Sequence, residues 1–287
     1  MINNFKSVWE IESGWFSEKD TMWPGISLWL KVKKVLLEQK TKFQDILIFE
    51  SESFWNVLVL DWVIQLTQRD EASYQEMLAH LPLFNHLCPE RVLIIWGWDL
   101  WILREVVKHN TVKDAVLCEI DEWVINASKK FFPEISANID NTKTKILIWD
   151  WSDFLNNNKE KFDVIIVDSS DPIWPANSLF TKDFYKSIKD NLSIWWIVAI
   201  QWESLFLHRE LASNLKGLMK DLFKFADYSQ VHVPTYPGWN IWLLVCSDIH
   251  DVKSPVRRPS ENMQNSLKYY SEDIHKASFV LPEGYKN

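Results

Sequence analysis

The chain has 287 residues, a formal net charge of -8 and 47% hydrophobic residues, enough for one large domain or two modest ones with a sizeable core. The negative charge argues against a nucleic-acid partner and would favour a cationic small substrate. No apolar run reaches the roughly 18 residues of a membrane span, and the charged N-terminus is unlike a signal peptide. The three cysteines are widely spaced and form neither a metal-binding pattern nor a disulfide framework. We therefore expect no bound metal, no membrane association and a cytoplasmic location.

Glycine is scarce and tryptophan abundant in this chain. It contains 6 glycines and 18 tryptophans, whereas about 7% of residues in an average protein are glycine. Many tryptophans stand where turn chemistry favours a small residue: Trp55, Trp62, Trp149, Trp151, Trp174, Trp195, Trp196 and Trp239. We interpret this pattern as a warning about folding and activity, not as the sign of an aromatic-binding function.

Residues 1–75 are predicted to form a small N-terminal domain of β-strands and hairpins. Short apolar runs predict strands at 46–49, 57–60 and 63–66. Trp55 and Trp62 fall in the turns between these strands, where positive φ angles are common and tryptophan is unfavourable. A helix predicted at 71–87, with a proline inside it, would join this domain to the rest of the chain.

Strands and helices alternate from residue 91 onward. Strands are predicted at 92–95, 115–119, 145–148, 164–167, 197–201 and 242–246, and helices at 102–108, 122–131, 181–192 and 208–223. This alternation predicts an α/β domain over 76–287, with a mostly parallel sheet and helices on both faces.

The strand, turn and helix at 92–107 have the pattern that opens a nucleotide-binding βαβ unit. The turn of such a unit normally carries several glycines, because the backbone must approach the ligand and the helix must pack close to the strand. Here Gly97 is the only glycine in the turn. Its neighbours are Trp96, Trp98, Leu100 and Trp101.

Acidic residues follow four consecutive predicted strands: Asp99, Glu119, Asp150, and the pair Asp168 and Asp171. Ligands of such sheets bind at the carboxyl ends of the strands, so these acids are expected along one edge. The turn offers no basic residue and no glycine-rich phosphate cradle, so the edge suits a positively charged nucleoside. Glu119 would bind the ribose hydroxyls, Asp150 the adenine amino group, and Asp99 would lie near the cationic side chain. The alternative is that each acid only caps a helix or starts a turn.

The loop 168–172, with the sequence DSSDP, carries two acids three residues apart. Such a pair can hold an ammonium group, and one carboxylate can accept its proton as the amine attacks carbon. A capped turn before the next helix is the alternative. Tyr74, Gln75 and Tyr236 would add polar groups to an amine channel, although a tyrosine alone is more often simply half-buried.

Several segments, in this order along the chain, closely resemble the spermidine synthase family of aminopropyltransferases: WFSE, MWPG, FQDILIFES, SYQEM, CEID, VIIVDSSDPI, TYP and LKYY. The resemblance covers nearly the whole chain. It implies a methyltransferase-like Rossmann fold with a small N-terminal β domain. The implied reaction transfers an aminopropyl group from decarboxylated S-adenosylmethionine to putrescine, giving spermidine and methylthioadenosine.

The resemblance also implies roles for individual residues. The nucleoside would be contacted by Gln44, Gln75, Asp99, Glu119, Asp150 and Trp151. The catalytic base would be Asp168, and the diamine would be bound by Tyr74, Asp168, Asp171 and Tyr236. Decarboxylated S-adenosylmethionine would be a co-substrate, with no resident cofactor or metal, and the chain would form a homodimer.

The departures from the family pattern all involve glycine. Where the family has a GGGDGG turn, this chain reads WGWDLW at 96–101, and Trp149 and Trp151 flank Asp150. Three hypotheses therefore stay open. The chain is a working spermidine synthase, a non-catalytic or altered scaffold whose nucleoside pocket is blocked by indole rings, or an S-adenosylmethionine-dependent methyltransferase. The DSSDP loop and the N-terminal β region argue against the last.

Overall fold

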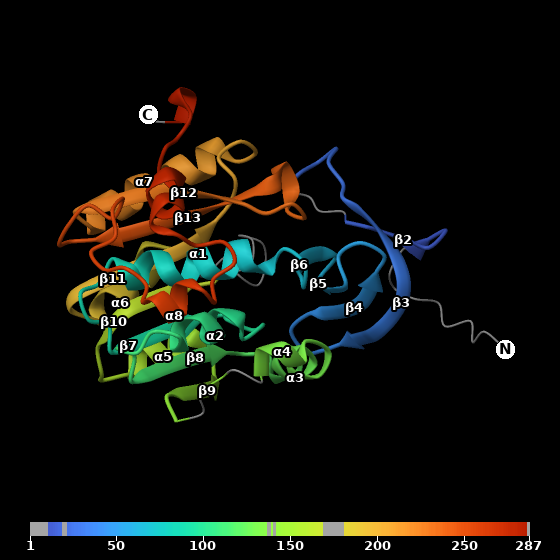
Figure 1. The fold of residues 1–287 in the computed structure, drawn as a ribbon, viewed down its shortest axis with the longest axis horizontal. Helices are drawn as coiled ribbons and strands as arrows, with labels where there is room; N and C mark the ends of the chain where they lie inside the picture. Colours follow the sequence, from blue (N-terminus) through green and yellow to red (C-terminus); the bar gives the residue numbers. More distant parts are fainter. Residues whose placement is uncertain (1–10, 19–21, 137–138, 140–141, 169–180, 286–287) are drawn as a thin grey trace. The chain divides into compact units, whose positions relative to one another are not determined.

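A computed structural model describes residues 11–18, 22–136, 139, 142–168 and 181–285 (Figure 1). Contacts divide the chain into two compact units, Met1–Glu71 with Val233–Trp239, and Ala72–His232 with Asn240–Asn287. The boundary at residue 75 between separately folding domains remains a prediction. In the described part of the chain, no helix is both long and apolar enough to cross a bilayer.

The N-terminal unit is built on an antiparallel sheet with the strand order β1-β2-β3-β4-β5-β6. The strands are β1 (Ile11–Glu12), β2 (Trp15–Ser17), β3 (Trp29–Lys40), β4 (Asp45–Ser51), β5 (Asn56–Leu60) and β6 (Val63–Thr67). Alternate residues of β4 and β5 point into one small core, which contains Phe49 and Val57 and also receives Phe16 from β2. The predicted strands at 46–49, 57–60 and 63–66 are confirmed.

The larger unit contains a seven-stranded sheet in the order β12-β13-β11-β10-β7-β8-β9. The strands are β7 (Arg91–Ile95), β8 (Asp114–Glu119), β9 (Thr144–Ile148), β10 (Phe162–Val167), β11 (Leu192–Trp202), β12 (Phe225–His232) and β13 (Asn240–Ser247). The five strands from β11 to β9 run parallel, and β13 and β12 are added antiparallel. The predicted mostly parallel sheet is confirmed. The acidic residues named above were expected at the edge formed by the carboxyl ends of its parallel strands.

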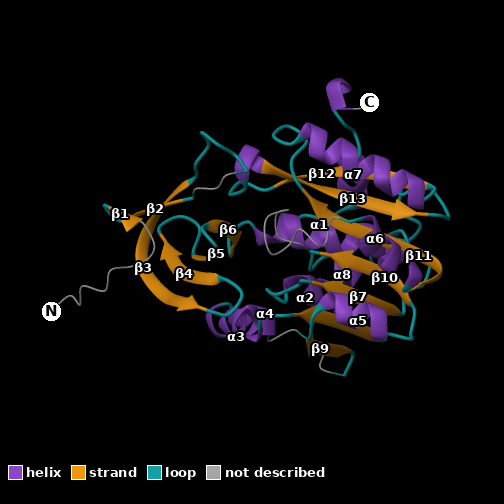
Figure 2. Cartoon of the chain, turned by 180° about the vertical axis from the view of Figure 1, so that it is seen from behind, coloured by secondary structure: helices purple, strands orange, loops and turns teal. Residues whose placement is uncertain are grey.

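Helices cover both faces of this sheet (Figures 1 and 2). The helices are α1 (Glu71–Phe84), α2 (Trp101–Val107), α3 (Glu122–Phe131), α4 (Pro133–Ser136), α5 (Trp151–Asn157), α6 (Lys182–Asp190), α7 (Arg209–Leu222), α8 (Glu261–Gln264) and α9 (Glu272–Ser278). Helices α5, α6 and α7 share one apolar core with β7, β10 and β11. Helix α1 meets α2 through a buried hydrogen bond between His80 and Glu105, 3.1 Å long.

Several parts of the larger unit were not predicted, namely strand β12 and the helices α4, α5, α8 and α9. Strand β12 carries polar residues such as Asp227 and Gln230 and lacks the apolar run of its neighbours. The short helices α8 and α9 lie in a tail whose composition is polar. Helix α1 retains Pro82 and ends at Phe84, three residues earlier than predicted, because the chain turns there towards β7.

Four tryptophans have the left-handed backbone conformation that glycine adopts at low cost. Their φ angles are 59° at Trp55, 76° at Trp62, 67° at Trp96 and 61° at Trp239. The expectation of positive φ in the two hairpin turns is confirmed. For a residue with a side chain, this conformation costs about 1–2 kcal/mol, because Cβ crowds the following carbonyl oxygen.

Replacing Trp55 with glycine should therefore stabilise the chain by about 1 kcal/mol, because the strain is removed while little burial is lost. Trp55 is 58% exposed. Trp29 is 50% exposed and lies within β3 without a positive φ, so Trp29→Gly is a matched control and should destabilise the chain. Urea unfolding of the three proteins measures both effects. Equal losses of stability in the two variants would contradict this account.

Candidate active site

The turn after β7 brings the first acid to the sheet edge. Trp96 donates its backbone N–H to the Cys118 carbonyl oxygen at 3.0 Å, so the chain stays beside β8 as it leaves β7. A Cβ added at Gly97 would lie 2.6 Å from Ile94 Cγ2 and 3.0 Å from Leu117 Cδ1, so only glycine fits there without movement. Asp99 follows and is 1% exposed. The tight turn thus buries a carboxylate at the carboxyl end of β7.

Asp99 is held by two hydrogen bonds that fix its orientation. One oxygen accepts from the backbone N–H of Trp101 at 2.9 Å, at the start of α2. The other accepts from the side-chain amide of Gln75, on α1. Gln75 is itself buried, and its Oε1 has no hydrogen-bond partner among the described residues. The fold thus brings together Gln75 and Asp99, which are 24 residues apart in sequence.

Glu119 ends β8 and is also buried. Its Oε1 accepts from the backbone N–H groups of Ile120 and Asp121, both at 2.8 Å. Its Oε2 has no partner within the described part of the chain. One half of this carboxylate is therefore fixed by the turn, and the other half is a buried acceptor available to a ligand.

Asp168 directly follows β10 and is 4% exposed. Its backbone N–H donates to the Ile95 carbonyl oxygen at 3.0 Å, which extends the β10–β7 pairing by one residue. The Tyr74 hydroxyl donates to Asp168 Oδ1, while Oδ2 is buried without a partner among the described residues. Two groups that are 94 residues apart in sequence, on α1 and after β10, are thus joined.

Burial and mutual repulsion raise the pKa values of Glu119 and Asp168. Desolvation raises the pKa of Glu119 to about 7, against the lowering effect of its two backbone hydrogen bonds. Desolvation also raises the pKa of Asp168 well above its usual value, with Asp99 and Glu119 adding repulsion and the Tyr74 hydroxyl opposing it. A cation placed among them would reverse both effects, because it favours the ionised carboxylates.

Asp150 and Trp151 lie after β9 and begin α5. Asp150 is the N-cap of α5, and its carboxylate accepts from the backbone N–H groups of Ser152 at 2.8 Å and Asp153 at 3.3 Å. The capping alternative therefore describes a real role of this residue. The Trp151 ring packs edge-on against Phe184, with ring centroids 4.6 Å apart.

The remaining predicted site residues lie outside the larger unit or outside the described residues. Gln44 and Tyr236 belong to the N-terminal unit. Gln44 accepts the Thr41 backbone N–H through its own carbonyl oxygen, in the turn before β4, and the Tyr236 hydroxyl donates to the Gln65 carbonyl oxygen at 2.6 Å. Asp171 and Trp174 lie outside the described residues.

Asp121 was not predicted as a site residue, although it stands in the CEID segment two residues after Glu119. It is 1% exposed, adds negative charge beside Glu119, and caps α3 by accepting from the Trp123 backbone N–H at 3.0 Å. Its position after a predicted strand and directly before a predicted helix could have identified it as a further acid at the sheet edge.

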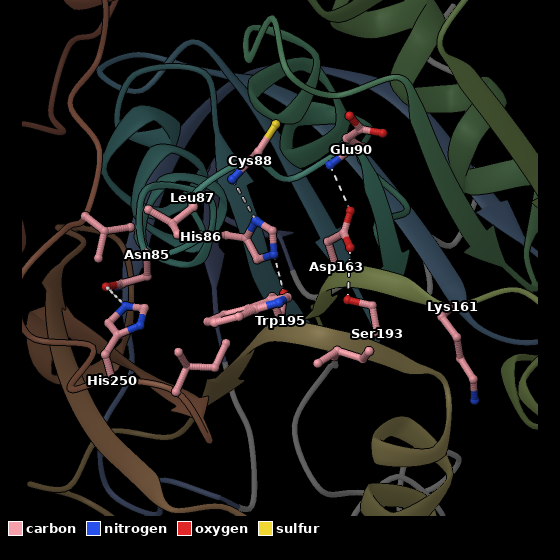
Figure 3. Close-up of a pocket in the computed structure, with 13 residues that line it drawn as sticks. Asn85, His86, Leu87, Cys88, Glu90, Lys161, Asp163, Ser193, Trp195 and His250 are labelled. Atoms are coloured by element: carbon pink, nitrogen blue, oxygen red, sulfur yellow. Dashed lines mark hydrogen bonds between the residues drawn. The ribbon is translucent and has the colours of Figure 1, made fainter.

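A separate cavity of about 750 Å³ opens at the other edge of the sheet (Figure 3). His86 and Asp163 lie on it together with the exposed Trp195. His86 donates from Nε2 to the Trp195 carbonyl oxygen, and Asp163 accepts from the backbone N–H of Glu90 at 2.9 Å. These residues precede β7 or stand near the start of β10 and β11, so this cavity is distinct from the acids at the carboxyl ends.

A mostly parallel sheet with helices on both faces and buried carboxylates at its carboxyl edge defines a Rossmann-like α/β protein. Comparison with known proteins then specifies the family. Residues 71–254 match the model of the spermine/spermidine synthase domain, and residues 14–68 match that of the spermidine synthase tetramerisation domain. The chain belongs to the spermidine synthase family of aminopropyltransferases, and the resemblance in its sequence is confirmed.

Similar proteins cover the chain almost completely. The spermidine synthase of Dictyostelium discoideum is 46% identical over 274 residues, which is 96% of this chain and 96% of that protein. That of Schizosaccharomyces pombe is 47% identical over 95% of this chain and 92% of its own length. The crystal structure of the Thermotoga maritima spermidine synthase matches with a TM-score of 0.87 at 33% identity, over 95% of this chain and 92% of that one.

The raised pKa of Glu119 predicts how stability depends on pH. The folded pKa of about 7 lies above the unfolded value of about 4.5, so the folded chain binds more protons between these values. This contribution is present at low pH and is lost as the pH rises through about 7. Urea unfolding on either side of this window should show a smaller loss of stability in Glu119→Gln than in the parent chain. Identical pH dependence in both proteins would contradict the buried, raised-pKa carboxyl.

Proposed function

We propose that this chain transfers the aminopropyl group of decarboxylated S-adenosylmethionine to putrescine, and so forms spermidine and methylthioadenosine. The observation that carries the proposal is the group of three buried acids at one sheet edge, Asp99, Glu119 and Asp168. Each is desolvated, and two have raised pKa values. Both substrates are cations, so both would relieve the repulsion among these groups. The family assignment supports the same reaction and favours it over methyl transfer.

The nucleoside half of the site would use the acids after β7, β8 and β9. The Oε2 of Glu119, which lacks a partner in the described part of the structure, is an acceptor for a ribose hydroxyl. Its location at the end of the second strand matches the ribose-binding acid of such folds. Asp99, oriented by Gln75, would face the cationic aminopropyl side chain. Asp150, Trp151 and Gln44 complete the proposed contacts with the nucleoside.

The diamine half would use Asp168 and Tyr74. The buried Oδ2 of Asp168, which has no partner among the described residues, is an acceptor for the reacting ammonium group, while the Tyr74 hydroxyl holds the other oxygen in place. Asp171 and Tyr236 would bind the diamine as well, and these two roles rest on the resemblance alone.

The chemistry needs positioning and one proton acceptor. The amine nitrogen forms a bond to the methylene carbon next to sulfur, the carbon–sulfur bond breaks, and its electron pair remains on sulfur as a neutral thioether. The proton lost by the attacking nitrogen goes to Asp168. Burial raises the pKa of Asp168 and so makes its carboxylate a stronger base, which suits it to accept a proton. A sulfonium is already a good leaving group, so the proposal requires no metal.

The N-terminal match to a tetramerisation domain supports assembly of the chain into an oligomer. We propose a homodimer as the smallest such assembly and the cytoplasm as its location.

A second hypothesis is a non-catalytic or altered scaffold of the same family. The observation in its favour is the crowding of the turn after β7, where Trp96 has a left-handed backbone and Trp98 is only 7% exposed beside Asp99. An indole ring at this position competes for the volume of a nucleoside.

Replacing Asp168 with asparagine tests the proposed base. Because an amide cannot accept the proton, kcat for spermidine formation should fall by roughly 10²–10⁴ while the chain stays folded. Asp153→Asn, an exposed change in the first turn of α5, is the control and should leave kcat unaltered. Spermidine is measured by chromatography after incubation with both substrates. Full activity in Asp168→Asn would exclude Asp168 as the base.

Methylthioadenosine separates the two hypotheses. If the indoles block the pocket, the nucleoside should not raise the melting temperature of the parent chain. It should stabilise the Trp98→Gly/Trp151→Gly variant, by about 2.7 kcal/mol at roughly 100 times Kd. Trp195→Gly, at the opposite edge of the sheet, should behave like the parent. Stabilisation of the parent chain itself would reject the blocked pocket.

A further inference from the structure

Glu76 is a buried carboxylate to which the proposed chemistry gives no role. It lies on α1, is 1% exposed, and accepts three consecutive backbone N–H groups from the C-terminal segment. Its Oε1 accepts from Lys268, and its Oε2 accepts from Tyr269 and Tyr270, each at 2.8 Å. This contact joins the SYQEM and LKYY segments, which are 192 or more residues apart in sequence.

Helix geometry places this contact opposite the site. Successive residues of an α-helix are rotated by about 100°, so Glu76 points roughly 150° away from the midpoint between Tyr74 and Gln75. Those two side chains reach Asp168 and Asp99 on one side of α1. The backbone of residues 268–270 binds Glu76 on the other side of α1. Rotation of α1 about its axis would break both sets of contacts together.

Other residues of the chain after β13 fix the C-terminal end of α1. The backbone N–H of Val256 donates to the Phe84 carbonyl oxygen at 2.9 Å, and the Arg257 guanidinium donates to the Leu83 carbonyl oxygen at 2.7 Å. The Tyr270 ring stacks on Phe84, with centroids 5.1 Å apart. With its last carbonyls satisfied, α1 is restrained along its axis, and Glu76 supplies the restraint on rotation.

We propose that Glu76 is a positioning residue, which holds α1 in the rotation that brings Tyr74 to Asp168 and Gln75 to Asp99. Its importance for turnover rests on the aminopropyl transfer proposed above, but the positioning itself is a property of the fold. The charged and titratable groups that face Asp168 in the described structure are Tyr74, Asp99 and Glu119. Of these, only Tyr74 is carried by α1.

The test is to titrate Asp168 in the Glu76→Gln variant. The titration is monitored by carbon NMR of protein labelled at aspartate, and the Asp168 signal is identified by its loss in Asp168→Asn. Glutamine keeps the shape of glutamate, but it points an N–H₂ group at a backbone N–H. We expect the Tyr74 hydrogen bond to loosen and the pKa of Asp168 to rise by roughly one unit, the effect of losing one hydrogen bond to a carboxylate. If Glu76→Gln does not fold, Glu76→Asp, with a shorter reach, carries the same measurement.

Two further variants make the result specific. Tyr228→Phe removes a buried hydrogen bond to the Ala212 carbonyl oxygen, 2.9 Å long, and should lower stability without moving the Asp168 titration. Tyr74→Phe should raise the pKa by itself, and adding Glu76→Gln to it should raise it no further. An unmoved titration in Glu76→Gln, or additive shifts in the double variant, would overturn the proposal.

Activity gives an independent reading. The acidic limb of the kcat/KM profile should move to higher pH in Glu76→Gln and stay in place in Tyr228→Phe. If the parent chain forms no spermidine, the proposed function fails while the NMR titration still decides the role of Glu76.

A second inference rests on the backbone alone. Among the described residues other than glycine, seven have positive φ, and four of these are tryptophan: Trp55, Trp62, Trp96 and Trp239. Trp55 and Trp239 are 58% and 67% exposed, so burial of the indole does not compensate for the strain at these two positions. Independent substitutions of glycine would introduce several residue types, but here a single type recurs.

We infer that the native polypeptide carries glycine at these four positions. One codon, rendered as tryptophan in this sequence, is then read as glycine in the cell that makes the protein. This accounts for the left-handed indoles, and it changes the scarcity of glycine and the excess of tryptophan in the expected direction. It also implies that the left-handed indole of Trp96 is absent from the turn after β7 in the native protein.

Peptide mass spectrometry of the protein purified from its own cell decides the matter. Peptides spanning positions 55, 62, 96 and 239 should have the masses of glycine-containing peptides. Trp15 and Trp23 are not among the residues with positive φ, and their peptides should retain tryptophan and serve as controls. Tryptophan at the four left-handed positions would refute the inference.

Discussion

The structure depends on placing several carboxylates out of water at one edge of a sheet. Asp99, Glu119 and Asp168 end or follow three adjacent parallel strands, so the strand spacing alone brings their charges close together. Such a group is costly unless protons or a cation compensate the charge. Burial raises the pKa values of Glu119 and Asp168, which favours compensation by protons. Substrates that are themselves cations, as proposed above, would provide the alternative.

Helix α1 organises these acids. Its Tyr74 and Gln75 hydrogen-bond Asp168 and Asp99, and its Glu76 binds the backbone of the C-terminal segment on the opposite side. The polar tail of the chain, which contains α8 and α9, therefore contacts α1 directly through Glu76. It restrains the helix whose Tyr74 hydrogen-bonds Asp168, the proposed base.

Much of this arrangement was predictable from sequence, for identifiable physical reasons. The buried parallel strands are nearly continuous apolar runs, such as Val92 to Ile95, and the acids follow from where those runs stop. Strand β12 was missed because Asp227 and Gln230 interrupt its apolar pattern. The Tyr74–Asp168 and Glu76–Tyr270 contacts span 94 and 194 residues, and local spacing carries no information about such pairs. The left-handed conformation of Trp55 and Trp62 was predictable from hairpin geometry, and the structure realises it in spite of the residue type.

The central claim is that the buried acids form a receptor for a cation. Calorimetric titration of the Trp98→Gly/Trp151→Gly variant with decarboxylated S-adenosylmethionine and with neutral methylthioadenosine, on either side of pH 7, tests it most directly. The account predicts that the sulfonium binds with release of protons and more tightly as the pH rises, while the thioether shows neither effect. Equal affinities with the same pH dependence, and no difference in proton release, would contradict it.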